Sequence, residues 1–261
     1  MSFGCELFIA SLIAAIVGFL GGYTGIAGGP FIVFLLSVSL GYSQHLAQGT
    51  VLAMMLGPMT ILPVIDGWNI IGKRWKEILV ATLAYMVFSL GGAEIAYLFS
   101  SPVLKLVFGV FIIVLGLTYI LFSMSRVSPI ADRSDKNVPL VLMALIGAFI
   151  GTVGGMVGIG AGILLIPILT IGLGIEQLEA QTMSLALLLP PVSIGAVAKY
   201  GFLENDVIWP VAGLMLLAYI ITSGLGYRFS LRHRTLVVQV VLSVLLVLAG
   251  VISIIQGAGL F

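Results

Sequence analysis

Residues 21–29 read GGYTGIAGG, and residues 154–162 read GGMVGIGAG. These two glycine-rich runs lie 133 residues apart in a chain of 261 residues. Glycine destabilises a helix interior by about 1 kcal/mol relative to alanine, so each run marks a helix that is interrupted or closely packed. The same offset of 133 residues also aligns a later set of positions: Gln44, Gln48, Leu52 and Pro58 with Gln177, Gln181, Leu185 and Pro191. A duplicated unit is the simplest explanation, and it divides the chain into two halves.

The composition is that of an integral membrane protein. Hydrophobic residues make up 61% of the chain, charged residues make up 8%, and the mean hydropathy is +1.26. Soluble domains have roughly 45–50% apolar and 25% charged residues. Several apolar runs reach the length of about 20 residues that a helix needs to cross a bilayer. We therefore predict an all-α fold, a polytopic bundle of transmembrane helices.

Apolar runs follow the same order in both halves of the chain. The predicted segments are 5–22, 30–42, 46–66, 77–99 and 103–124, then 138–157, 162–174, 178–198, 207–227 and 236–256. The polar stretch SRVSPIADRSDKNVP at 125–139 separates the two sets. We predict a first membrane repeat over 1–125, a cytoplasmic linker over 126–137 and a second membrane repeat over 138–261.

The distribution of Lys and Arg predicts opposite orientations for the two halves. These residues gather on the cytoplasmic side of membrane proteins. In the first half the basic loop, GKRWKE at 72–77, precedes the fourth segment, whereas in the second half the basic loop, YRFSLRHR at 227–234, follows it. We therefore predict inverted repeats in the cell membrane, with both termini outside.

The second segment of each half is too short to span a membrane. Residues 30–42 and 162–174 cover only about 20 Å as helix, against about 30 Å of hydrocarbon. Each segment is predicted to form a broken or re-entrant hairpin with the segment before it. Interrupted helices at corresponding positions of inverted repeats point to the substrate site of a transporter.

The glycine runs have the properties of an anion site. Unwound backbone exposes N–H groups, and a helix N-terminus carries partial positive charge, so two such ends could hold one small anion. The predicted substrate-binding residues in the runs are Gly25, Ala27, Gly28 and Gly29, with Gly158, Gly160 and Gly162. The alternative is helix packing, because glycines four residues apart let membrane helices approach closely.

Polar residues in the third segment of each half are candidates to complete this site. Gln48 and Gln181 are predicted either to bind substrate oxygens or to cap the unwound backbone, since an unpaired amide is unfavourable in lipid. Four further residues are candidates to line the path: Gln44 and Thr60, with Gln177 and Ser193. Thr60 and Ser193 could instead satisfy carbonyls freed by bends at Pro58 and Pro191.

Glu94 lies inside an apolar run, SLGGAEIAYLF at 89–99, where a carboxylate could carry a coupling proton or reach the interface. At the offset of 133 its counterpart is Tyr227. The sequence has no HExxH, GxSxG or Walker pattern, so we predict no enzyme, no metal site and no cofactor. The expected partners are a small anionic substrate and the lipid bilayer, with no nucleic acid, and homo-oligomer formation is left open.

The runs GGYTGIAGGPF (21–31) and GGMVGIGAGILLIP (154–167) resemble the TauE/SafE family of membrane proteins. The resemblance covers essentially the whole chain and implies movement of a small sulfur-containing anion, such as sulfite, thiosulfate or an organosulfonate like sulfoacetate. We therefore expect a secondary transporter in which one repeat rocks against the other to give alternating access. An anion channel on the same scaffold and a non-transporting membrane scaffold are the alternatives.

Overall fold

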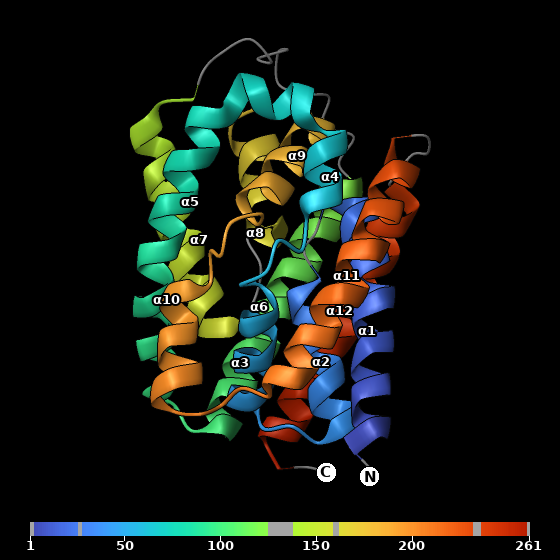
Figure 1. Cartoon of the computed structure of the whole chain (residues 1–261), viewed down its shortest axis with the longest axis vertical. Helices are drawn as coiled ribbons and strands as arrows, with labels where there is room; N and C mark the ends of the chain where they lie inside the picture. The colour runs from blue at the N-terminus through green and yellow to red at the C-terminus, as the bar shows by residue number, and fades with distance from the viewer. Residues whose placement is uncertain (1–2, 26–27, 125–137, 159–161, 232–235, 260–261) are drawn as a thin grey trace.

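The computed structural model describes residues 3–25, 28–124, 138–158, 162–231 and 236–259, and within these ranges the chain is a bundle of helices without strands (Figure 1). The first half contains α1 (Phe3–Thr24), α2 (Gly29–Leu40), α3 (Gln44–Met54), α4 (Ile61–Asp66), α5 (Trp68–Tyr97) and α6 (Ser101–Met124). The second half contains α7 (Leu140–Val157), α8 (Gly162–Pro167), η1 (Ile168–Gly172), α9 (Gln177–Leu187), α10 (Ile194–Val197), η2 (Ala198–Leu203), α11 (Trp209–Ser230) and α12 (Leu236–Gly257), where η1 and η2 are π-helical.

Five helices within the described ranges are long and apolar enough to cross a membrane. They are α1, α5, α7 and α11, together with the part of α6 from Ser101 to Ile120. The predicted all-α polytopic bundle is therefore confirmed. The predicted linker over 126–137 lies outside the described residues.

The short second segments turn back on the helices that precede them. α2 has 12 residues and runs back to the end of the molecule at which α1 begins (Figure 1). There the Tyr42 hydroxyl donates a hydrogen bond to the Glu6 carboxylate on α1. Burial, together with this carboxylate, raises the pKa of Tyr42 above its ordinary value. In the second half the corresponding short segment is divided into α8 and η1.

The third segment of each half differs from the expectation of one bent helix. α3 ends at Met54 and α4 begins only at Ile61, and in the second half the gap lies between Leu187 and Ile194. Proline lacks the N–H that would continue the ladder of backbone hydrogen bonds, and Pro58 lies inside the first gap. The bends predicted at the prolines are therefore complete interruptions.

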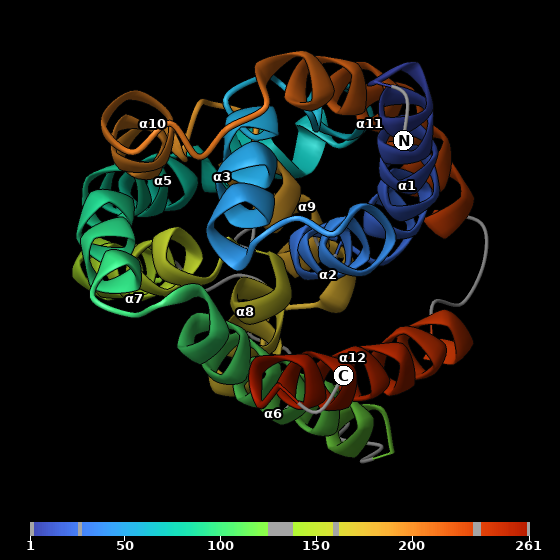
Figure 2. The same cartoon turned by 90° about the horizontal axis from the view of Figure 1, so that it is seen from below.

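The long helices form three close pairs around the short ones. α1 packs along α11, α5 along α7, and α6 along α12, while α2, α3, α8 and α9 lie in the interior (Figure 2). Glycines let the paired backbones touch. A Cβ on Gly22 would lie 2.0 Å from the Ser223 carbonyl oxygen, and one on Gly155 would lie 2.0 Å from that of Ser89. Gly22 and Gly155, one in each run, therefore allow close helix packing.

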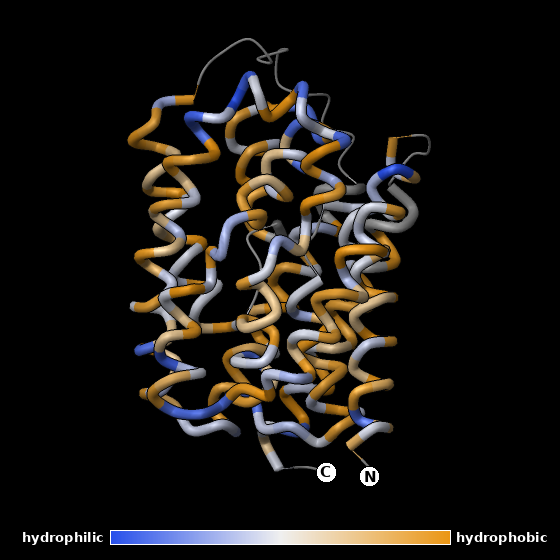
Figure 3. The backbone as a smooth tube through the Cα atoms, in the orientation of Figure 1, coloured by the Kyte–Doolittle hydropathy of each residue, from blue (hydrophilic) through white to orange (hydrophobic). Residues whose placement is uncertain are grey.

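The two ends of the bundle can be told apart by the helices that finish there. We call the end at which α1 begins and α12 ends the terminal end, and the end at which α6 ends and α7 begins the linker end (Figure 1). Hydrophilic residues gather at both ends, and the lengths of the outer helices between them are hydrophobic (Figure 3). This distribution is that expected for a bundle that spans a bilayer.

Candidate functional site

The glycine runs end the first helix of each half. Gly25 and Gly158 each have a φ of +72°, a left-handed conformation that glycine adopts without strain. Their backbone N–H groups bond to the carbonyls of Gly21 and Gly154, at 2.8 and 2.9 Å. Both helices therefore end in the middle of predicted apolar sequence by the same C-capping geometry.

Each of these glycines contacts a predicted glutamine of the other half. A Cβ on Gly25 would lie 2.2 Å from Cγ of Gln181, and a Cβ on Gly158 would lie 2.8 Å from Cγ of Gln48. The contacts are reciprocal, because each half supplies a glycine to the other half's glutamine. The structure thus brings four predicted site residues together as two pairs, Gly25 with Gln181 and Gly158 with Gln48.

The amide of Gln181 is used to cap α1. Its Nε2 donates to the carbonyls of Gly22 and Tyr23, at 3.0 and 3.2 Å, and lies 3.3 Å from Oγ of Ser230. The last carbonyls of a helix have no partner within the helix. Gln181 is buried, so its amide supplies the hydrogen bonds that water cannot.

The amide of Gln48 is only half used. Its Oε1 accepts a hydrogen bond of 2.9 Å from the Tyr200 hydroxyl. Its Nε2 has no hydrogen-bond partner among the residues that the structure describes, although Gln48 is 0% exposed. Leaving a buried donor unpaired costs about 1–3 kcal/mol, so this amide calls for a ligand or a water molecule.

A second unpaired donor lies at the start of α2. The hydroxyl of Tyr219 on α11 interacts electrostatically with the backbone of Gly28, but it makes no hydrogen bond of normal geometry with any residue in the described part of the chain. Tyr219 is 0% exposed. Gly28 is the N-cap of α2 and has no capping side chain, and Gly29 and Pro30 follow it as buried residues. Tyr219 was not predicted from the sequence, because a tyrosine in an apolar segment resembles any other core residue.

Thr60 and Ser193 bind carbonyls across the two halves. Thr60 Oγ1 donates to the Leu185 carbonyl and Ser193 Oγ to the Leu52 carbonyl, each at 2.7 Å. Each carbonyl belongs to the last turn of the helix, α9 or α3, that directly precedes a proline-containing gap. These hydroxyls therefore satisfy carbonyls of the opposite half, where the sequence suggested carbonyls of their own helix.

Two serines on the long helices donate hydrogen bonds to carbonyls inside the two proline-containing gaps. Ser223 Oγ donates to the Met59 carbonyl at 3.1 Å, and Ser89 Oγ to the Val192 carbonyl at 3.5 Å. These two interruptions were not predicted from the sequence to be parts of the site. The prolines were the available signal, and reading them as bends underestimated their effect.

The remaining predicted residues lie further out. Gln44 begins α3 at the terminal end and Gln177 begins α9 at the linker end, and the Nε2 of each has no hydrogen-bond partner among the described residues. Gly162 begins α8. Ala27 and Gly160 lie outside the described residues. Among the residues that are described, no group of three His, Cys, Asp or Glu could hold a metal ion.

Glu94 forms an ion pair at the terminal end of the bundle. Its carboxylate lies 3.2 Å from Lys199 Nζ, and its side chain is 54% exposed. At the linker end Asp66 pairs with Arg228 at 2.7 Å. Lys199 corresponds to Asp66 at the offset of 133 residues. We call these the terminal-end pair and the linker-end pair.

The counterpart of Glu94 is Arg228, because the long helices match at an offset of 134. A Cβ on Gly92 would approach the Thr152 carbonyl oxygen, at 1.9 Å, as one on Gly226 would approach that of Phe19, at 2.0 Å. The offset of 133 that gave Tyr227 is therefore wrong by one residue for this helix. The two ion pairs occupy corresponding positions with their charges exchanged.

The sequence profile of the sulfite exporter TauE/SafE family matches residues 58–252, which is most of the chain. The chain belongs to the TauE/SafE family. The match begins at Pro58 inside the first proline-containing gap and includes the second gap and the second glycine run, while the first glycine run precedes it.

A TauE/SafE assignment agrees with the curated relative that the chain matches. The chain is 28% identical over 253 residues to a probable membrane transporter protein of Methanocaldococcus jannaschii, and the match covers 92% of each chain. No solved structure matches the chain. The TauE/SafE family and this relative together identify the chain as a membrane transporter protein.

Proposed function

We propose that this TauE/SafE protein is a secondary transporter that carries a small sulfur-containing anion across the cell membrane. The candidate substrates are sulfite, thiosulfate and organosulfonates such as sulfoacetate. The observation that carries the proposal is the meeting of each glycine break with the buried glutamine of the other half. This contact places interrupted backbone from both halves beside polar side chains inside an apolar bundle.

The donors at the two breaks fit an oxyanion. The Nε2 of Gln48 at the second break and the hydroxyl of Tyr219 at the first break are buried and donate to no residue that the structure describes. α2 begins at Gly29 with its N-terminus uncapped by any side chain. N–H and O–H donors and the positive end of a helix all favour negative charge. A tetrahedral or pyramidal sulfur anion presents several oxygens to such donors, and hydrogen bonds to a charged group are stronger than those between neutral groups.

The two halves have unequal roles in this proposal. Gln181 stabilises the end of α1 through the carbonyls of Gly22 and Tyr23 and has no donor left for substrate. Gln48 retains a donor, so it makes the side-chain contact with the anion. Of the two roles that the sequence allowed for the glutamines, Gln181 takes the capping role and Gln48 the binding role.

The contacts that occur twice, with the two halves exchanged, support alternating access. We interpret the two halves as inverted repeats, because the glycine–glutamine contacts and the Thr60 and Ser193 hydrogen bonds each occur twice with the halves exchanged. In this interpretation the terminal-end pair closes the outer side and the linker-end pair closes the inner side. Each pair joins a broken third segment to a long helix, so opening one side requires breaking one pair.

The proposed orientation places the linker end in the cytoplasm and both termini outside. Lys73, Arg74, Lys76 and Arg228 all lie at the linker end, as expected for a cytoplasmic face. Glu94 belongs to the terminal-end pair in this proposal, and its exposed position supports that role better than proton coupling.

The proposal is tested with purified protein in lipid vesicles. Uptake of radiolabelled sulfite should saturate, and unlabelled sulfite trapped inside the vesicles should accelerate the entry of the label. Flux that does not saturate, together with large single-channel currents, would identify an anion channel. Absence of any flux, with no stabilisation of the protein by sulfite, thiosulfate or sulfoacetate, would leave only the scaffold alternative.

A further inference from the structure

A cleft lies at the linker end, between the first turns of α5 and the start of α7. Its volume is about 350 Å³. It is lined by Lys73, Trp75, Lys76 and Glu77 from α5 and by Val138 and Leu140. None of these residues belongs to the proposed anion site.

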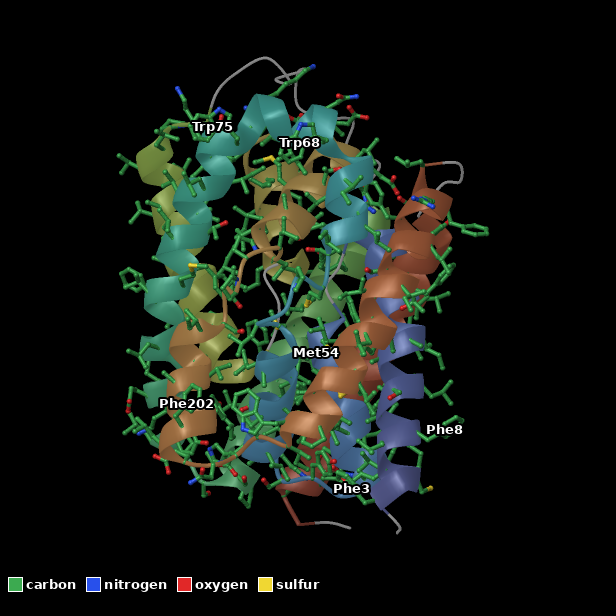
Figure 4. The ribbon with its side chains drawn as sticks, in the orientation of Figure 1. Phe3, Phe8, Met54, Trp68, Trp75 and Phe202 are labelled. Atoms are coloured by element: carbon green, nitrogen blue, oxygen red, sulfur yellow. The ribbon has the colours of Figure 1, made fainter. Side chains whose placement is uncertain are left out.

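The cleft is placed at the depth of lipid headgroups. α5 is kinked at Arg74, whose φ of −114° and ψ of 15° are not helical, and the turns before the kink lie across the end of the bundle (Figure 1). Trp68 and Trp75 are 64% and 53% exposed at this end (Figure 4). Exposed tryptophans of membrane proteins concentrate at the boundary between hydrocarbon and water.

The unpaired charges that line the cleft are positive. The Glu77 carboxylate is 3.5 Å from the Arg74 guanidinium, which also binds Glu179 at 2.6 Å. Lys73 and Lys76 are exposed, and neither makes an ion pair with any residue that the structure describes. Lys76 Nζ lies 5.6 Å from the centroid of the Trp75 ring. Two ammonium groups therefore remain available to one anionic partner.

Apolar stripes continue from the cleft towards the middle of the bundle. On α5, Trp75 is followed at intervals of four residues by Leu79 and Leu83, which are 47% and 54% exposed. On α7, Val141 and Leu145 are 74% and 63% exposed. Residues four apart lie above one another on a helix. A molecule held by the lysines would thus have apolar surface directly below its charged group.

We propose that this cleft binds the headgroup of an anionic phospholipid, with Lys73 and Lys76 on the phosphate, Trp75 at the glycerol level and the acyl chains on the apolar stripes. The stripes favour a lipid over a free phosphate compound, which would leave them without a function. Basic pockets between helices at the cytoplasmic surface are suited to such headgroups. The proposal does not depend on sulfur-anion transport.

Native mass spectrometry of the full-length protein tests this site. The probes are dioleoyl phosphatidylglycerol and dioleoyl phosphatidylcholine, added to the wild type, to the double variant Lys73→Gln/Lys76→Gln and to Lys105→Gln. Lys105 lies on α6 at the terminal end, so Lys105→Gln is a control that removes one positive charge away from the cleft. Each lysine near a membrane surface contributes about a fivefold gain in binding of anionic lipid.

The wild type should retain phosphatidylglycerol in preference to phosphatidylcholine. This preference should fall by about 25-fold in the double variant and stay unchanged in Lys105→Gln. If the double variant does not elute as a folded monodisperse species, each single variant should show a loss of about fivefold. Equal retention of both lipids by the wild type, or an unchanged preference in the lysine variants, would overturn the proposal. Displacement of the lipid by millimolar glycerol 3-phosphate would overturn it in favour of a soluble phosphate ligand.

Discussion

Gly25 and Gln181 come from different halves of the chain, and Cγ of the glutamine lies 2.2 Å from the position that a Cβ on the glycine would take. The same glutamine donates its amide hydrogens to the carbonyls of Gly22 and Tyr23. One side chain from the second half therefore fixes both the shape and the hydrogen bonding of the first break. Gln48 makes the reciprocal contact with Gly158, but among the described hydrogen bonds its amide donates to no backbone carbonyl of that break.

Gly25→Ala should destabilise the protein more than Gly41→Ala. Both glycines have a φ of +72°, so both variants incur the left-handed strain of about 1–2 kcal/mol. A Cβ on Gly41 meets nothing within 4 Å, whereas one on Gly25 overlaps Gln181, which adds about 1–3 kcal/mol. Reversible unfolding in mixed micelles measures the difference. Equal destabilisation of the two variants would show that the glutamine contact is not tight.

Gln48→Leu and Gln181→Leu should separate binding from stability. Gln181→Leu leaves two buried carbonyls without their partner, so the free energy of unfolding should fall by about 1–3 kcal/mol. Gln48→Leu leaves the buried Tyr200 hydroxyl without its acceptor, but it also removes an unpaired Nε2, so stability should fall less than in Gln181→Leu while sulfite transport is lost. Thermal unfolding and vesicle uptake are measured on both. Loss of stability in Gln48→Leu with transport retained would reverse the assigned roles.

Thr60→Val should destabilise the protein by about 1–3 kcal/mol, because it leaves the buried Leu185 carbonyl unpaired. The control is Thr118→Val, which removes an exposed hydrogen bond to the carbonyl four residues earlier in α6. Chemical unfolding should detect a change of less than about 0.5 kcal/mol for this control. A Thr60→Val protein as stable as the control would mean that the gap between α9 and α10 does not need the hydroxyl.

Exchanging the two charges of the terminal-end pair should restore the sulfite counterflow that each single charge reversal slows. Because Lys199 Nζ also lies 3.1 Å from the Glu204 carboxylate, every variant carries Glu204→Gln. In that background Glu94→Lys or Lys199→Glu places like charges together and should slow sulfite counterflow, and the double reversal should recover it. The linker-end pair already has the opposite order of charges at corresponding positions, so the fold accepts either order. Because Glu94 is more than half exposed, the effect on stability should stay below about 1 kcal/mol. A double variant as slow as the singles would separate this pair from transport.

The sequence predicted the all-α bundle, its short second segments and the end of the first helix in each half, because apolar runs and glycine runs are local signals. The left-handed Gly25 and Gly158 lie at corresponding positions where helices end, as the runs indicated. The interruptions around Pro58 exceeded the prediction, because a lone proline permits either a kink or a break and tertiary hydrogen bonds decide between them. Those bonds come from two serines of the second half, Ser223 to the Met59 carbonyl and Ser193 to the Leu52 carbonyl.

The parts that the sequence could not supply are contacts between distant residues. Tyr219 reaches the start of α2 only because α11 packs along α1 through glycines such as Gly22. The pairing of Glu94 with Lys199 likewise depends on where η2 meets α5. A shift of one residue in the alignment of the long helices concealed Arg228 as the counterpart of Glu94. None of these relationships leaves a periodic or compositional pattern in the sequence.

The affinity for sulfite of Tyr219→Phe, compared with that of Tyr119→Phe, tests the central claim most directly. Both variants remove one buried hydroxyl that has no hydrogen-bond partner within the described ranges, but only Tyr219 faces the break at Gly28. Calorimetric titration should show sulfite binding weakened about tenfold or more by Tyr219→Phe, the value of one hydrogen bond to a charged ligand. Tyr119→Phe should bind like the wild type. Wild-type affinity in both variants would contradict an anion site at the glycine breaks.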